Sequence, residues 1–138
     1  MTKRRTLLDR MQTRIARTRS DVFLPGDFAD LSGEDQVLRG LRQLVRDNRL
    51  TRLGYGVYGR ATVSGLTGKP MLYSQDGFIG AARQALTKLG VAWEPSAAER
   101  AYNEGRSTQI PVNPVVRLKE GRFSRRLHYG DTELIVER

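Results

Sequence analysis

Arginine is the residue type in this chain that offers the most chemistry. The 138 residues hold 24 Lys and Arg against 15 Asp and Glu, a formal net charge of +9, and only four of the basic residues are lysine. The planar arginine fork matches phosphate groups and guanine edges, whereas lysine acts as a point charge. Residues 1–60 carry 13 basic and 7 acidic groups and residues 61–138 carry 11 and 8, so the excess is +6 and then +3. This distribution predicts a polyanionic partner that contacts mainly the first half.

Residue types suited to catalysis are scarce. The absence of cysteine removes thiolate chemistry and cysteine-rich zinc sites, and the single histidine, His128, has no G-x-S-x-G motif or acidic metal cluster to accompany it. The stretch GLTGKP fails as a phosphate loop, because Val63 stands where the first glycine is required and Pro70 where Ser or Thr is required. We therefore expect no enzyme, no cofactor and no metal. With no apolar run of membrane-spanning length and no secretion signal, a cytoplasmic location is expected.

The first helix is predicted over residues 6–19, where apolar residues recur at helical spacing after a capping box that begins at Thr6. Arg10, Arg14 and Arg17 share another face of this helix. Such a face is typical of solvent exposure, and contact with phosphate groups is the alternative.

A second, longer helix follows a short strand at residues 22–24 and a brief helix at residues 25–31. Ser32 is a natural N-cap for the segment GEDQVLRGLRQLVRDN, whose apolar residues also repeat at helical spacing. Polar side chains occupy the opposite face: Gln36, Arg39, Gln43 and Arg46, with Asp35 on its margin. Leu50–Leu53 and Val57–Tyr58 then flank Gly54-Tyr55-Gly56, which predicts a basic hairpin whose glycines supply positive φ angles.

The order helix, short strand, short helix, long helix and basic hairpin is typical of a winged helix-turn-helix, in which the long helix enters the major groove and the hairpin is the wing. The predicted DNA contacts come from the long helix, the hairpin and the first helix: Ser32, Asp35, Gln36, Arg39, Gln43, Arg46, Arg49, Arg52, Tyr55, Tyr58, Arg60, Arg10 and Arg14. The alternative is a small α+β core whose exposed helix face is merely polar.

The second half is predicted as a separate small α+β unit. Residues 61–75 are expected to form a connector with little structure of its own, and residues 76–138 a unit with a helix closed by Gly90, a short helix capped by Ser96, and three strands at 115–119, 123–129 and 133–136. Because this unit has a marginal core, we expect it to tether or dimerise the DNA-binding domains. The alternative is a monomer in which it only supports the wing.

Three stretches carry a resemblance to a known family: VFLPGDFADL, VLRGLRQLVRDNRLTRLGYGVYGR, and AERAYNEGRSTQIP followed by RRLHYGDTELIVER. Through them the chain resembles the small AbiEi-like antitoxins, winged-helix partners of abortive-infection, type IV toxin–antitoxin systems. The resemblance implies a DNA-binding N-terminal domain that represses its own operon, with the recognition helix starting over residues 32–39 and the wing at residues 52–58. It also implies a C-terminal part that counters a nucleotidyltransferase-like toxin.

The combined prediction is an α+β protein with an N-terminal winged helix-turn-helix (1–60), a connector (61–75) and a small C-terminal domain (76–138). It is expected to be a sequence-specific transcriptional repressor and autoregulating antitoxin, with double-stranded DNA and a homodimer partner but no membrane contact. A protein-only antitoxin whose basic surface meets an acidic toxin is one alternative. A structured-RNA binder is another, although Tyr55, Tyr58 and Tyr129 do not form the row of stacking aromatics typical of RNA-binding sheets.

Overall fold

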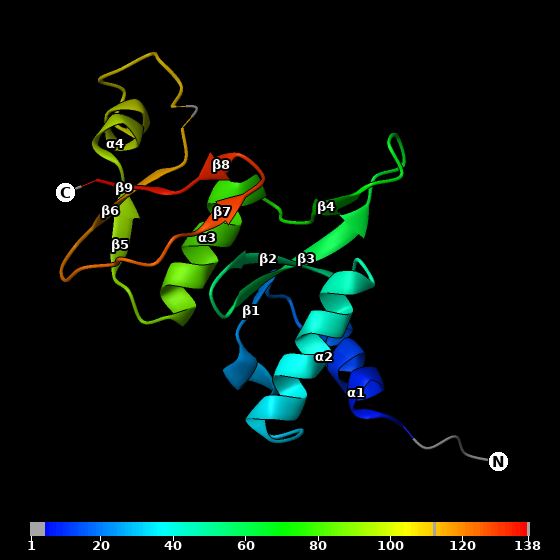
Figure 1. The fold of residues 1–138 in the computed structure, drawn as a ribbon. Helices are drawn as coiled ribbons and strands as arrows, with labels where there is room; N and C mark the ends of the chain where they lie inside the picture. Colours follow the sequence, from blue (N-terminus) through cyan, green and yellow to red (C-terminus); the bar gives the residue numbers. More distant parts are fainter. Residues whose placement is uncertain (1–4, 112, 138) are drawn as a thin grey trace.

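The described part of the chain contains four α-helices, one 3-10 helix and nine short strands (Figure 1). The structure is a computed structural model that describes residues 5–111 and 113–137. The elements are α1 (Leu7–Arg17), β1 (Val22–Phe23), the 3-10 helix η1 (Pro25–Phe28), α2 (Glu34–Arg46), β2 (Leu50–Gly54), β3 (Val57–Val63), β4 (Pro70–Leu72), α3 (Gly77–Lys88), β5 (Trp93–Pro95), α4 (Ala97–Asn103), β6 (Val115–Leu118), β7 (His128–Tyr129), β8 (Thr132–Glu133) and β9 (Ile135–Glu137). The predicted α+β class is confirmed.

The start of α1 follows from local hydrogen bonding. The Thr6 hydroxyl accepts a hydrogen bond from the Asp9 N–H at 3.1 Å, and the Asp9 carboxylate accepts one from the Thr6 N–H at 3.1 Å. This reciprocal capping box satisfies two backbone donors that would otherwise lack a partner. The helix therefore begins where the sequence predicts it.

The start of α2 differs by one residue from the prediction. Gly33, in an extended conformation (φ −64°, ψ 160°), is the N-cap, so the assignment of Ser32 to that position is wrong. Gly33 makes no side-chain cap hydrogen bond, but Glu34 and Asp35 place two carboxylates in the first turn. Their negative charge interacts favourably with the helix dipole, which compensates for the missing cap.

The central sheet is built from the first four strands. Its order is β1-β3-β2, all antiparallel, and β4 pairs with the outer part of β3 from Ala61 to Val63. Successive side chains of a strand point to opposite faces, so Phe23, Leu50 and Tyr58 face one way and Val22, Leu53 and Val57 the other. Both sets are buried, and each face of the sheet therefore needs a covering layer.

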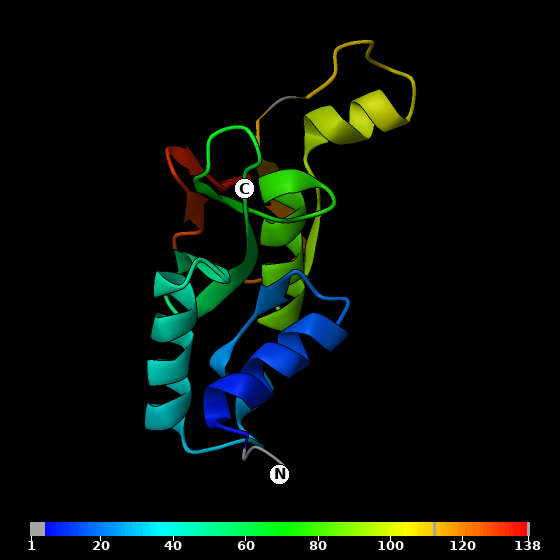
Figure 2. The ribbon, with the colours of Figure 1, turned by 90° about the vertical axis from the view of Figure 1, so that its right-hand side faces the viewer.

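The two covering layers come from different halves of the chain (Figures 1 and 2). On one face, α1, α2 and η1 complete the helix-side core, whose residues are Met11, Ile15, Phe23, Phe28, Val37, Leu41, Leu44, Leu50 and Tyr58. On the other face, α3 and the C-terminal segments complete the α3-side core of Val22, Leu53, Val57, Leu72, Ala81, Ala82, Ala85, Leu86, Val116, Leu127 and Leu134. The sheet is thus the middle layer of three.

The predicted boundaries do not separate independent cores. Residue 60 lies inside β3, and the stretch 61–75 contains the end of β3 and all of β4. Polar contacts also join the halves: the Lys88 ammonium lies 2.6 Å from the Asp27 carboxylate and donates to the Val22 carbonyl at 3.0 Å. The Gln84 side-chain oxygen accepts from the Asp21 N–H at 2.9 Å. The second half is therefore packed onto the sheet of the first.

The C-terminal segments form two further small sheets. β6 pairs antiparallel with β5 and parallel with β9, while β7 and β8 form a hairpin. Gly90 ends α3 with φ 79°, and the Ser96 hydroxyl caps α4, both as predicted. Of the predicted strand 123–129 only residues 128–129 are extended in a ladder, because the preceding segment turns in to bury Leu127 against the central sheet.

Candidate nucleic-acid interface

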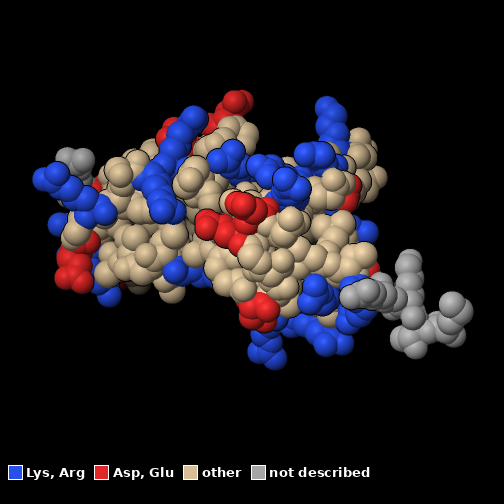
Figure 3. Space-filling view, turned by 60° about the horizontal axis from the view of Figure 1, so that its bottom comes forward, with Lys and Arg blue, Asp and Glu red and all other residues tan. Residues whose placement is uncertain are grey.

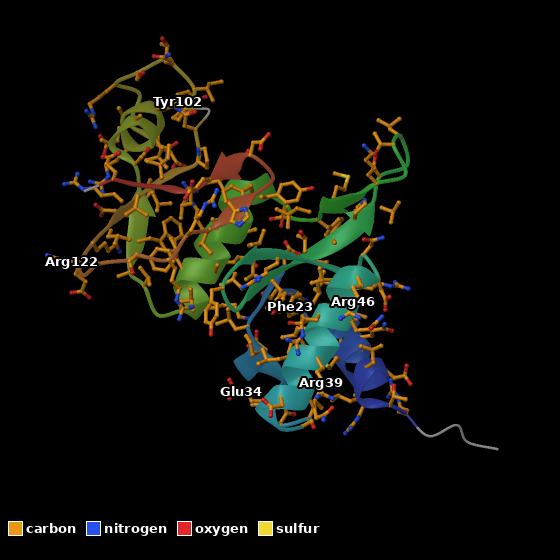
Figure 4. All side chains as sticks on the ribbon, in the orientation of Figure 1. Phe23, Glu34, Arg39, Arg46, Tyr102 and Arg122 are labelled. Atoms are coloured by element: carbon orange, nitrogen blue, oxygen red, sulfur yellow. The ribbon has the colours of Figure 1, made fainter. Side chains whose placement is uncertain are left out.

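The exposed face of α2 presents a row of arginines. Arg39, Arg42 and Arg46 are exposed and form no hydrogen bond or ion pair with any residue that the structure describes. Arg49 is also exposed, in the turn between α2 and β2. Figure 4 shows Glu34, Arg39 and Arg46 spaced along α2, with Arg46 at the end nearest the sheet. Four arginine side chains are therefore available to an anionic ligand along one helix and the turn after it.

Arg42 belongs to this row but was not among the predicted contacts. It lies three residues after Arg39 and four before Arg46, so the helical spacing alone places all three on neighbouring positions of one surface. The prediction grouped Gln36 and Gln43 with the arginines instead. Arg17, exposed and without a described partner at the end of α1, was likewise left out.

The remaining predicted residues of α2 differ in their availability. Asp35 and Gln36 are exposed in the first turn, whereas Gln43 is half-buried and its amide donates to the Asp47 carboxylate at 3.0 Å. Ser32 is half-buried in the turn before the helix. The N-terminal turn of α2 is thus acidic and its C-terminal two-thirds basic, so the most favourable position for a phosphate chain is beside the later turns.

The arginines of α1 have two different roles. Arg10 is exposed and has no partner among the described residues, and it lines an open groove of about 550 Å³ together with Arg14, Arg17 and Leu31. Arg14 donates to the Asp30 carboxylate from both terminal guanidinium nitrogens, Nη1 and Nη2, the latter at 2.8 Å, and Nη1 also donates to the Asp27 carbonyl at 2.9 Å. Arg14 therefore ties α1 to the turn after η1, which leaves it less free for phosphate than predicted.

This pair makes a testable prediction about Asp30. The hydrogen bonds from Arg14 hold the pKa of the Asp30 carboxyl below its usual range. Because the folded pKa is depressed, the contribution of the pair to stability is present above the ordinary Asp pKa and is lost as the pH falls through the lowered value. We expect Arg14→Ala to raise the pKa of Asp30 toward its ordinary value, measured by NMR titration of side-chain carboxyl carbons. An unchanged titration in the variant would contradict the pairing.

Two residues of the predicted wing belong to the core. Tyr58 is only 7% exposed and packs with Phe23 in the helix-side core, so little of its side chain is available for the predicted DNA contact. Arg60 donates to the carbonyls of Thr18 and Ser20 at 3.0 and 2.8 Å, and its guanidinium lies 5.4 Å from the centre of the Phe23 ring. These contacts fix the chain between α1 and β1 against β3, which makes Arg60 structural.

The tip of the predicted wing is a tight turn that lies against the C-terminal tail. Gly54 pairs with Val57, and Gly56 adopts φ 66°, so only two residues make the turn. A Cβ atom on Gly54 would stand 2.5 Å from the Arg126 carbonyl oxygen, and glycine permits this close approach. Tyr55 at the tip is 76% exposed. Arg52 is also exposed, although its Nε donates to the Gly54 carbonyl at 3.2 Å.

Figure 3 shows the face of the molecule that points mainly downward in Figure 1. Charged side chains of each sign gather in groups on this face. Basic side chains line the upper edge of this view and gather again at its lower edge, and a group of acidic side chains lies between them. An anionic ligand is therefore directed to particular basic groups, because the acidic group repels it from the middle of this face.

Other kinds of site find little support among residues 5–111 and 113–137. No group of three or more His, Cys, Asp or Glu within these residues could hold a metal ion. None of their helices combines the length and the apolar character needed to cross a membrane. Comparison of the chain with protein-family models, with curated proteins and with solved structures finds no match.

Proposed function

We propose that this protein binds duplex DNA sequence-specifically through α2 and represses its own promoter. The observation that carries the proposal is the row formed by Arg39, Arg42 and Arg46. Seven other arginines are held in ion pairs within the fold, whereas the guanidinium groups of these three have no partner among the described residues. A helix whose exposed face carries three guanidinium groups without partners is suited to the anionic groove of duplex DNA.

We propose further that the first half acts as a winged helix-turn-helix. Its elements follow the order α1, β1, η1, α2, β2, β3, and its sheet has the strand order β1-β3-β2. In this assignment α2 is the recognition helix that enters the major groove, and the β2–β3 hairpin lies beside the DNA backbone. The packing of α2 against the sheet through Val37, Leu41 and Leu44 leaves its arginine face outward.

Different side chains have different tasks in this mechanism. Arg39 and Arg42 read guanine O6 and N7 with their forked donors, and Gln36 reads adenine N6 and N7. Arg46, Arg49 and Arg10 contact phosphates and set the register of the protein on the duplex. Asp35 in the acidic first turn accepts a hydrogen bond from cytosine N4.

The biological setting that we propose rests on the resemblance to the AbiEi-like antitoxins. In this setting the protein is a cytoplasmic, autoregulating antitoxin, and its protein partner is a nucleotidyltransferase-like toxin. Repression then follows from occupation of the promoter by the antitoxin itself. In this proposal DNA binding precedes repression, and the residues of α2 carry out the DNA binding.

The salt dependence of binding tests the proposal. Each phosphate neutralised by an arginine releases counterions and contributes about −0.9 to the slope of log affinity against log salt concentration. With the three phosphate-contacting residues Arg10, Arg46 and Arg49 engaged, we expect a slope of about −2.7 on a labelled promoter duplex, measured by fluorescence anisotropy. A scrambled duplex should bind more weakly than the promoter. A slope near zero, or tighter binding to an RNA hairpin of equal length, would refute duplex DNA as the ligand.

A further inference from the structure

The hairpin of residues 61–73, here called the arm, projects from the body of the molecule (Figures 1 and 2). It consists of the end of β3, the loop 64–69 and β4 with the residue that follows. Four of the eight large hydrophobic side chains exposed among the described residues lie on it: Val63, Leu66, Met71 and Tyr73. The other four are divided among separate elements. An apolar group of this density on a projecting hairpin indicates a protein contact.

The loop of the arm is held in one conformation by hydrogen bonds. The Ser64 hydroxyl accepts from the N–H groups of Leu66 and Thr67 at 3.2 and 3.3 Å, and the Ser64 N–H donates to the Lys69 carbonyl at 2.8 Å. The Gly68 N–H closes the loop on the Ser64 carbonyl at 2.9 Å. Leu66 is nevertheless 98% exposed. The hydrogen bonds therefore order the backbone that carries this apolar side chain, which lowers the entropy cost of burying it in a contact.

The arm is also almost free of charge, which decides what kind of partner fits it. Residues 61–75 contain one charged residue, Lys69, in a chain of which 28% is charged and whose net charge is +9. A polyanion would instead be attracted to the arginines of α2. Two copies of so basic a chain repel one another unless they meet through a neutral surface. The outer part of the arm, from Val63 to Met71, provides such a surface, whereas Tyr73 at its base lies beside Arg49 and Arg60.

We propose that the arm is a self-association surface, at which two copies of this chain meet in a two-fold contact formed by Leu66, Met71 and Tyr73. In an isologous contact the same apolar side chains come from both copies, so one short segment provides both sides of the interface. None of these three residues belongs to α2. It concerns association of the protein with itself and does not depend on DNA.

Sedimentation equilibrium of the full chain without DNA tests the proposal. From about 1 to about 100 µM we expect the average mass to rise toward twice that of the monomer. Leu66→Lys places a charge on each side of the contact, and we expect the dissociation constant to rise by about 100-fold or more. Ile110→Lys, at an aliphatic residue that is 64% exposed outside the arm, is the matched control and should leave association unchanged. Circular dichroism checks that both variants fold.

Cross-linking gives a second readout, because the natural chain has no cysteine. Leu66→Cys should form a disulfide-linked dimer on mild oxidation much faster than Ile110→Cys. A wild-type chain that stays monomeric to about 100 µM would overturn the proposal. Equal association of the Leu66→Lys chain, or equal cross-linking at the two positions, would do so as well. Because these samples contain no DNA, failure of self-association and failure of duplex binding are separate results.

Discussion

Replacing Arg39, Arg42 and Arg46 together by alanine lowers affinity for the promoter duplex by about 100-fold or more. Each base-reading arginine contributes about 1–3 kcal/mol of discrimination, and each arginine that neutralises a phosphate contributes to the salt slope. Because Arg46 is the one phosphate contact among the three, the slope becomes shallower by about 0.9. The three side chains are exposed and have no described partner in the fold, so the variant should keep its helix content. Anisotropy titrations at several salt concentrations measure both effects.

A triple variant elsewhere in the chain controls for net charge. Lys119, Arg122 and Arg125 are exposed between β6 and β7, and their replacement by alanine removes the same three positive charges. Arg122 lies at the opposite end of the molecule from Arg39 and Arg46 (Figure 4). We expect this control to change affinity by less than about tenfold, through the long-range field alone. Equal losses in the two triple variants would show that charge and not the α2 surface determines binding.

Leu41→Ala in α2 should destabilise the second half of the protein as much as the first. Leu41 is fully buried in the helix-side core, and its truncation should lower the free energy of unfolding by about 2–5 kcal/mol. The one tryptophan, Trp93, lies in β5 on the other side of the central sheet. Because β1, β2 and β3 contribute to both cores, we expect the Trp93 fluorescence transition and the helical circular dichroism transition to shift together in denaturant.

The neighbouring exposed residue provides the control for this experiment. Arg42→Ala should change the free energy of unfolding by less than about 0.5 kcal/mol. A Trp93 transition that stays in place while the helical signal shifts would mean two independent domains. The same reasoning applies to a chain that ends at residue 60, which leaves Val22, Leu53 and Val57 without their α3-side partners. At about 1.5–3 kcal/mol for each such side chain, this loss is comparable to the whole stability of a domain.

The local elements could be predicted because their causes lie within a few residues. The Thr6–Asp9 capping box, the α3 helix closed by Gly90 and the Ser96 cap of α4 all depend on neighbours in the same turn. The period of the apolar residues then gives the type of element and its buried face. Even here a one-residue error arose at α2, since Gly33 and Ser32 both allow a helix to start.

The candidate site could be predicted only in part, because the same residue type has different roles in different surroundings. Arg39 and Arg60 both lie beside apolar stretches of the sequence. Arg39 is nevertheless exposed, whereas only 20% of the Arg60 side chain is exposed. The partners of Arg60 are Thr18, Ser20 and Asp21, about 40 residues earlier in the chain. Nothing in the residues adjacent to Arg60 indicates these partners.

By itself, the sequence determined the α+β class, the helices with their polar faces, the turn at Gly56 and the basic character of the first half. The tertiary structure alone decided that residues 61–75 extend the sheet, that β6 pairs in parallel with β9, and that both halves pack on one sheet. The physical reason is the range of the interactions. Helix caps, turns and amphipathic periods arise between residues a few positions apart, whereas strand partners and the burial of a side chain are set by segments that meet only when the whole chain has folded.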